Sequence, residues 1–285
     1  MRLFAWVAVV MVAFAANSVL NRAAVGAGLI EPVAFGVIRL WAGAAMLAVL
    51  AFALRGGLRL GGAGRVAGVL GLLAYIFGFS WAYVDLPSGL GALILFGMVQ
   101  VTMFAGSLLG GERPPLLRWV GAGLAFAGLM WLAWPSGGAS GGLWAVMSMV
   151  AAGVGWGVYS LAGRKAADAL GSTAANFVIA APLALLPMGV DPGPMTGGGI
   201  ALAVLSGAVT SGLGYALWYA VLPRLDGAVA AVAQLTVPMI AALGGVLLLG
   251  EPLTVTFLMA SAVILGGVAL SVLGPRYFAR SSSGS

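Results

Sequence analysis

The feature that most restricts the fold of this chain is a succession of ten long apolar runs, separated by short polar connections. A helix that crosses a bilayer needs about 20 predominantly apolar residues, and most of the runs are close to that length. Only Arg39 carries a charge well inside a run. The sequence therefore predicts an all-α integral membrane protein whose ten transmembrane helices cover residues 3–25, 32–54, 65–84, 88–109, 115–134, 143–163, 172–188, 197–222, 227–249 and 253–274.

The composition supports a lipid environment. Hydrophobic residues make up 62% and charged residues 7% of the 285 positions, whereas soluble domains carry about 25% charge. So few polar groups could not cover the surface of a soluble fold of this size. The 46 glycines would weaken soluble helices, but in a membrane small residues let helices approach one another closely.

The distribution of basic residues predicts the orientation. If both termini lie on the same side, as ten spans require, that side carries 11 of the 13 basic residues. The positive-inside rule then places both termini in the cytoplasm of a bacterial-type inner membrane. The net charge of +6 is explained by this topology, so no nucleic-acid partner is expected. The 11 residues are Arg2, Arg55, Arg59, Arg65, Arg113, Arg118, Arg164, Lys165, Arg224, Arg276 and Arg280.

The residue types that are missing restrict the chemistry. The chain has no cysteine and no histidine, which removes disulfides, the usual haem and zinc sites and histidine bases. We expect no cofactor and no metal, and an intramembrane enzyme is disfavoured. The only lysine, Lys165, falls in a predicted loop, so a retinal photoreceptor is disfavoured too. All acidic residues fall at span ends or in loops: Glu31, Asp85, Glu112, Asp168, Asp191, Asp226 and Glu251.

Two similar turns indicate an internal repeat. Gly111-Glu112-Arg113-Pro114 follows the fourth run, and Gly250-Glu251-Pro252 follows the ninth, with 251 − 112 = 139 residues between the two glutamates. Asn17–Arg22 also aligns with Tyr159–Arg164 at an offset of 142. In such a turn glycine ends one helix in left-handed geometry, glutamate faces the positive end of the next helix dipole, and proline suits the first helical position.

The repeat predicts two inverted halves. Each half holds five spans, an odd number, so the second half enters the membrane from the opposite side. We expect a first five-helix unit over residues 1–136, a second over 137–276 and a flexible tail over 277–285. Inverted repeats are typical of alternating-access transporters, whose substrate site lies near the middle of the membrane between the halves.

The halves resemble a known family. Their glycine-rich last helices, Val120–Gly128 and Ala260–Val268, follow the Gly-Glu-Pro turns, and Pro32–Arg39 resembles the second-helix pattern of the same family. The chain is similar to the EamA domains of the drug/metabolite transporter superfamily, most of all to exporters of aromatic amino acids. The resemblance implies a ten-helix fold and export of small metabolites. Ala181-Pro182 stands where the second half would repeat Arg39, so any role of Arg39 is not duplicated.

Aromatic side chains at helical spacing are the first candidates for a substrate site. Tyr75 and Phe79 share one face of the third span, Trp156 and Tyr159 lie in the sixth, and Tyr215 lies in the eighth. Tyrosine hydroxyls within a membrane need partners, so these faces are expected to look inward, at a cavity lined by rings. The alternative is an aromatic belt at the membrane interface. It applies most to two residues near span ends, Tyr83 and Trp218.

Amide side chains within spans are the second candidates. Asn17, Gln100 and Gln234 each have to pair with protein, water or substrate in this environment. An amide both donates and accepts, which suits the amino and carboxylate groups of an amino acid. The alternative is plain hydrogen bonding between helices.

One charge and two possible hinges complete the candidates. Arg39 could neutralise a substrate carboxylate, but the sequence favours snorkelling to the headgroups or pairing with Asp85. Pro238 removes a backbone hydrogen bond within the ninth span, and Gly97 is the nearest analogue in the fourth. Bent helices at matching positions of two halves often mark a transporter's site.

The sequence and the resemblance together predict a transporter that exports aromatic and other neutral amino acids by alternating access. A monomer suffices for such a pathway, and no buried carboxylate is available to couple transport to protons. Other small metabolites or drugs remain as alternative substrates. A sugar phosphate is a poorer fit, because it would need a buried basic cluster.

Overall fold

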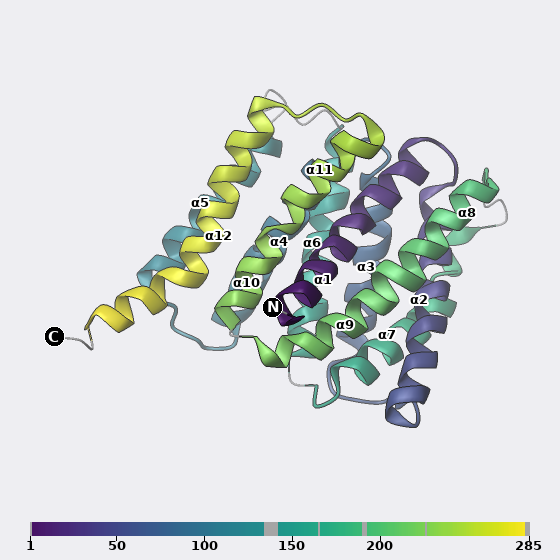
Figure 1. The fold of residues 1–285 in the computed structure, drawn as a ribbon, viewed down its shortest axis with the longest axis horizontal. Coiled ribbons are helices and arrows are strands. Elements are labelled where there is room, and N and C mark those ends of the chain that lie inside the picture. Colours follow the sequence, from purple (N-terminus) through teal and green to yellow (C-terminus); the bar gives the residue numbers. More distant parts are fainter. Residues whose placement is uncertain (1, 134–141, 165, 190–192, 226, 283–285) are drawn as a thin grey trace.

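The computed structural model describes residues 2–133, 142–164, 166–189, 193–225 and 227–282, and these are almost entirely helical (Figure 1). The α-helices are α1 (Arg2–Asn21), α2 (Pro32–Arg55), α3 (Arg65–Ala82), α4 (Ser88–Leu109), α5 (Leu116–Ala133), α6 (Leu143–Gly163), α7 (Ala169–Leu183), α8 (Gly197–Val204), α9 (Gly214–Val221), α10 (Gly227–Leu235), α11 (Val237–Leu249) and α12 (Val255–Ser282).

The helices confirm a multi-pass membrane protein. Within the described residues, 9 helical segments are long and apolar enough to cross a bilayer, and α5 has a shorter apolar part, Leu116–Trp131. Together they match the ten predicted spans. The eighth span is composite, because α8 and α9 are joined by a π-helical stretch, Leu205–Leu213. Helix α12 continues through Ser282, so residues 277–282 of the expected tail are helical. Residues 283–285 and the expected boundary between residues 136 and 137 lie outside the described part.

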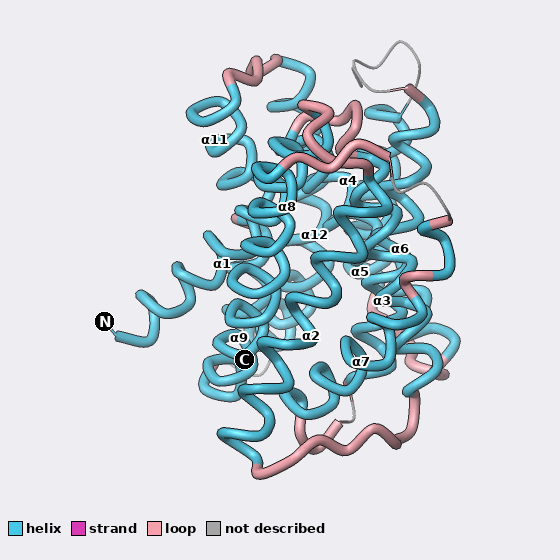
Figure 2. The backbone as a smooth tube through the Cα atoms, turned by 90° about the vertical axis from the view of Figure 1, so that its right-hand side faces the viewer, coloured by secondary structure: helices cyan, strands magenta, loops and turns pink. Residues whose placement is uncertain are grey.

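Contacts between helix ends show that successive spans alternate in direction. On one side Arg55 lies 3.3 Å from Asp168, and Arg164 lies 3.5 Å from Glu112. We call this side the basic face. On the other side the Thr196 amide donates to the Leu29 carbonyl at 2.9 Å. We call that side the opposite face. Figure 2 shows the connecting loops gathered at these two ends of the helices.

The packing of the helices agrees with two inverted repeats. In the repeat, α1 is equivalent to α6, and α3 is equivalent to the eighth span. Helix α3 packs along α6, and α1 packs against the eighth span. Equivalent helices also pack on one another: α2 with α7, α4 with α11, and α5 with α12. Two further contacts match each other across the halves, because α4 packs on α6 and α11 packs on α1. The pair α5 and α12 forms one edge of the molecule in Figure 1. A two-fold relation between the halves produces this exchange of partners.

The twin turns confirm one part of the prediction and correct another. Gly111 and Gly250 both have positive φ, at 78° and 66°, so glycine ends α4 and α11 as predicted. The prediction that the prolines occupy the first helical position is wrong. Pro115 directly precedes α5, and Pro252 stands three residues before α12. Helix α12 is capped instead by Thr254 Oγ1, which accepts from the Phe257 amide at 3.1 Å.

The ninth span is interrupted where the sequence placed a proline hinge. Helix α10 ends at Leu235 and α11 begins at Val237, so Pro238 is in the first turn of a new helix. Helix α4 continues unbroken through Gly97. A Cβ at Gly97 would lie 2.9 Å from the Leu129 side chain of α5. Gly97 therefore allows close packing, and the two halves differ here.

Candidate functional site

A cavity of about 760 Å³ lies between the halves. This volume is typical of small-molecule sites. Its walls come from the first, third, fourth, sixth, seventh, eighth and ninth spans. All eight residues predicted to bind substrate line it: Asn17, Tyr75, Phe79, Gln100, Trp156, Tyr159, Tyr215 and Gln234.

A close approach of two helices positions the aromatic part of the cavity. A Cβ at Gly155 of α6 would lie 2.7 Å from the Gly71 carbonyl oxygen of α3, and a Cβ at Gly71 would lie 2.7 Å from the Gly155 carbonyl. Two glycines thus let the backbones touch. Tyr75 follows Gly71 by one turn and Trp156 follows Gly155 directly, so their ring centroids lie 4.8 Å apart.

Trp156 is the centre of this aromatic cluster. Its ring stacks on Tyr159 with an angle of 18° between the planes and 5.0 Å between the centroids. The Tyr215 ring centroid lies 5.3 Å from that of Trp156. Phe79 extends the cluster through Tyr75, at 5.3 Å. The arrangement joins rings from α3, α6 and α9 and can offer flat apolar faces to a ligand.

Asn17 forms the centre of a polar network between α1 and the eighth span. Its Oδ1 accepts from Ser206 Oγ at 2.8 Å, from Thr210 Oγ1 at 2.6 Å and from Ser211 Oγ at 3.4 Å. These three hydroxyls belong to the π-helical stretch of the eighth span, and π-helical turns occur often at functional sites. None of the three hydroxyls is among the candidates that the sequence predicts. The pattern that could have indicated them is a set of polar residues within an apolar run, with Thr210 and Ser211 four and five positions after Ser206.

Arg39 is fully buried behind the aromatic wall, with an exposure of 0%. Its Nε donates to Ser211 Oγ at 3.2 Å, and its Nη2 donates to the Tyr75 hydroxyl at 2.9 Å. Its guanidinium carbon lies 5.2 Å from the Tyr75 centroid and 5.0 Å from that of Phe79. Snorkelling and pairing with Asp85, which the sequence favoured, are both wrong. Asp85 is exposed, and α3 and the π-helical stretch supply neutral partners that hold the guanidinium inside.

The cavity reaches the basic face at the end of α6 and the start of α7. Gly163, Arg164 and Ala166 line this mouth, and Arg164 is half-exposed. Further in, the Tyr159 hydroxyl donates to Thr173 Oγ1 at 2.9 Å, and Thr173 Oγ1 donates to the Tyr219 hydroxyl at 3.2 Å. The mouth is therefore polar, while the middle of the cavity is aromatic.

The inner layer of the opposite end is closed by two buried polar residues. Asn21 Nδ2 donates to Ser80 Oγ at 3.3 Å, and both residues have an exposure of 0%. This hydrogen bond joins α1 to α3 beyond Asn17. The Tyr83 hydroxyl, one turn further along the chain, donates to the Ser88 carbonyl at 3.2 Å. Tyr83 is fully buried and Trp218 lines the cavity, so neither belongs to an aromatic belt at the interface.

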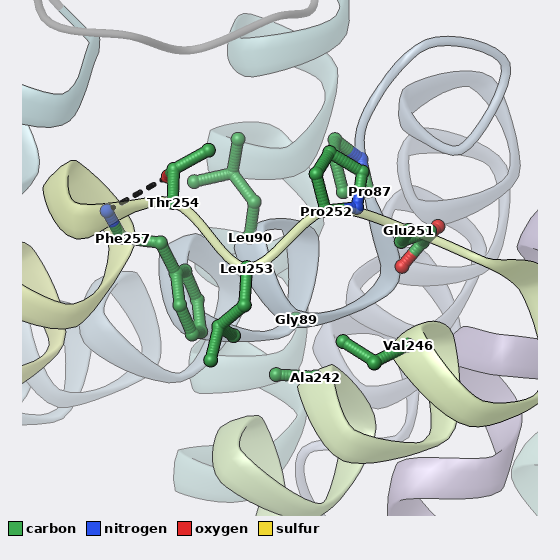
Figure 3. A pocket seen from close by; sticks show the side chains of 10 residues that line it. All are labelled: Pro87, Gly89, Leu90, Ala242, Val246, Glu251, Pro252, Leu253, Thr254 and Phe257. Atoms are coloured by element: carbon green, nitrogen blue, oxygen red, sulfur yellow. Dashed lines mark hydrogen bonds between the residues drawn. The ribbon is translucent and has the colours of Figure 1, made fainter.

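An outer layer joins four helix ends through Glu251. Its carboxylate accepts from the Ser88 amide at 2.9 and 3.1 Å and lies 3.5 Å from Arg22 Nε. Arg22 Nη1 also donates to the carbonyl of Tyr83 at 3.1 Å. Figure 3 shows Glu251 beside Pro87, at the edge of a small pocket between α4 and the turn before α12. Glu251 thus faces the positive end of α4 and not that of α12, which corrects the sequence prediction.

The electrostatic character of the cavity is one-sided. Among the described residues its lining includes no aspartate or glutamate, and the one charged member among them is Arg164. Within the described residues no group of three or more histidine, cysteine or acidic side chains could hold a metal ion. Pairing with an ionic ligand would therefore involve cationic or neutral groups of the protein.

Comparison with known proteins agrees with these features. The sequence profile of the EamA-like transporter family matches residues 143–273. An uncharacterized protein of Pseudomonas aeruginosa is 44% identical over 275 residues, which cover 93% of this chain and 92% of that protein. An uncharacterized transporter of Archaeoglobus fulgidus is 26% identical over 211 residues, 72% of this chain and 75% of that one.

A solved crystal structure shares the fold. It has a TM-score of 0.67 and 23% sequence identity, and the match covers 94% of this chain and 98% of that chain. At this level of identity the match shows only the architecture. The family profile, the similar bacterial protein and the helical membrane fold lead to one conclusion: the chain belongs to the EamA-like transporter family.

Proposed function

We propose that this protein exports aromatic and other neutral amino acids across a bacterial-type inner membrane by alternating access. The observation that carries the proposal is that all eight aromatic and amide residues expected from the sequence line the same cavity. Stacked rings favour a flat apolar side chain. Amides and hydroxyls can pair with amino and carboxylate groups.

The two ends of the cavity support the direction of transport. The lining reaches the basic face, while Asn21, Ser80 and the Glu251 contacts close the opposite end. If the basic face is cytoplasmic, as the positive-inside rule predicts, this conformation is ready to receive a substrate from the cytoplasm. Export then needs the opposite end to open and the basic end to close.

The proposed movement is a rocking of the units 1–136 and 137–276 about the cavity. The break between α10 and α11 at Thr236 lies two residues from Gln234, which lines the cavity. Pro238 is therefore well placed to act as a hinge. Gly97 would be its counterpart in the first half and would act through a change in the contact between α4 and α5.

We propose that transport is not coupled to protons through a buried carboxylate. Proton-driven transporters commonly keep a titratable acid within the membrane, and the described residues that line this cavity include none. The gradient of the substrate itself would then drive export.

Counterflow of labelled tryptophan, phenylalanine and leucine into proteoliposomes tests these statements. We expect flux of at least the aromatic amino acids above that of protein-free liposomes, with little change when a pH gradient is imposed. Absence of flux for all three amino acids would refute the substrate assignment. Strong stimulation by the pH gradient would refute the uncoupled mechanism and leave the substrate assignment intact.

Export of other small metabolites or drugs is the second candidate. It is supported by the absence of an acidic side chain from the part of the lining that the structure describes, since no carboxylate there receives the ammonium group of an amino acid. Competition by unlabelled metabolites in the same assay separates the two candidates.

A further inference from the structure

The buried charge of Arg39 has no countercharge in the described part of the protein. Within those residues none of the ion pairs includes Arg39, and its Nη1 has no hydrogen-bond partner. A guanidinium stays protonated in proteins. An uncompensated charge in a low-dielectric interior is costly. Neutral hydroxyls and two aromatic rings reduce this cost without cancelling the charge.

The hydrogen bonds of Arg39 give its cavity-facing neighbours a donor character. The Tyr75 hydroxyl accepts from Arg39 Nη2, so its own hydrogen is left to donate elsewhere. Ser211 accepts from Arg39 Nε and lies within donor distance of Asn17 Oδ1. Because that oxygen also accepts from two other hydroxyls, the groups that Asn17 has left for a ligand are the N–H donors of its amide.

These donors converge on one ligand chemistry. Tyr75 and Asn17 both line the cavity, and Arg39 stands behind them with its charge. Hydrogen bonds to an ionised acceptor are about twice as strong as those between neutral groups. In the described part of the lining no acidic side chain offsets the positive potential or receives a ligand cation.

We propose that Arg39 is a positioning residue that makes this cavity selective for organic carboxylates. The carboxylate of the substrate docks on Tyr75 and Asn17, and its apolar or aromatic body lies against the rings around Trp156. The carboxylate is required, and an ammonium group is not. The inference rests on the proposed passage of substrate through this cavity and narrows the substrate class.

Three probes that share a phenyl ring and differ in charge test the proposal: 3-phenylpropionate, L-phenylalanine and phenethylamine. Isothermal titration calorimetry on the purified full chain in detergent measures their binding. We expect 3-phenylpropionate to bind at least as tightly as phenylalanine, and phenethylamine to bind at least about tenfold more weakly. Binding of phenethylamine as tight as that of 3-phenylpropionate would overturn the proposal, as would failure of all three to bind.

Variants of Arg39 separate positioning from structural support. Arg39→Met should lower the ratio of 3-phenylpropionate to phenethylamine affinity by about tenfold, and Arg39→Lys should keep most of it. Arg55→Met is the matched control, because Arg55 is an exposed arginine paired with Asp168 outside the cavity. A folded Arg39→Met protein with an unchanged ratio would overturn the proposal.

If Arg39→Met does not fold, the relative affinities of the three probes for the unaltered protein decide whether the cavity selects carboxylates. Tyr75→Phe then provides a milder change, since it keeps the ring and removes the hydroxyl next to Arg39. It should lower the same ratio, and no change would count against the proposal. Binding of 3-phenylpropionate without phenylalanine would refute the amino acid assignment and support this inference. Equal binding of phenylalanine and phenethylamine would refute this inference and leave the amino acid assignment standing.

Discussion

The guanidinium of Arg22 lies 3.5 Å from the carboxylate of Glu251 at the opposite face. The repeat forms the same pair again at the basic face, where Arg164 lies 3.5 Å from Glu112. The two pairs differ in burial. The Glu251 side chain is 11% exposed and the Glu112 side chain 45% exposed. One sequence element thus takes part in a closed end and in an accessible end of the same protein.

Replacing Glu251 by glutamine should open the opposite end. The change removes the charge that holds the Ser88 amide and Arg22, and hydrogen bonds to charged groups contribute about 1.5–3 kcal/mol each. The chain has no cysteine, so Ser18→Cys supplies a single label inside the cavity. We expect several-fold faster reaction with an impermeant maleimide added to spheroplasts.

Asp85→Asn is the control for this experiment, since Asp85 is an exposed acid at the same face. It should leave the rate of labelling unchanged. An equal rate in the Glu251→Gln protein and in the unaltered protein would show that Glu251 does not hold this end closed.

Truncation of Tyr75 should lower transport more than loss of its hydroxyl alone. Tyr75→Ala removes a ring that contacts Trp156 at 4.8 Å and also the acceptor for Arg39. A single aromatic pair contributes about 0.5–1.5 kcal/mol, so we expect initial flux to fall at least severalfold. Trp144→Ala removes a ring that is 69% exposed on α6, away from the cavity lining, and serves as the control. Equal flux in the unaltered, Tyr75→Ala and Tyr75→Phe proteins would show that Tyr75 serves packing and not transport.

Gln234 should matter for substrate binding and little for folding. It lines the cavity near the end of α10, just before the break in the ninth span. Gln234→Ala removes one amide, and we expect a higher KM for transport with an unchanged amount of folded protein in size-exclusion chromatography. Leu247→Ala, at a 70% exposed site of α11, is the control. A fall in folded protein without a change in KM would indicate a structural role.

Alanine at two glycines should have opposite effects on stability. At Gly155 the added Cβ would lie 2.7 Å from the Gly71 carbonyl oxygen, whereas at Gly123 it would meet nothing within 4 Å. Overpacking costs about 1–3 kcal/mol, and replacing an exposed helical glycine by alanine gains up to about 1 kcal/mol. Thermal unfolding in detergent should therefore show a lower Tm for Gly155→Ala and an equal or higher Tm for Gly123→Ala. A Gly155→Ala protein as stable as the original would mean that α3 and α6 can separate without cost.

Much of the cavity lining could be predicted because the cost of exposing a polar group to lipid depends on that residue alone. A tyrosine such as Tyr75 or an amide such as Gln100 cannot face hydrocarbon without a partner, so its presence in a span already indicates an inward face. The same reasoning failed for Tyr83, which lies near a span end but is buried among helices. Position along the chain indicates depth in the membrane and does not indicate which neighbours surround a side chain.

The sequence by itself determined the number of spans, their alternating direction and the inverted repeat, because hydropathy, charge placement and the Gly-Glu-Pro turns are properties of short segments. Only the tertiary structure decided that Arg39 lies behind Tyr75, bound to Ser211, and that Glu251 caps α4. These contacts join residues from different spans. They depend on how closely the helices approach and on the π-helical stretch of the eighth span, and neither can be read from apolar length.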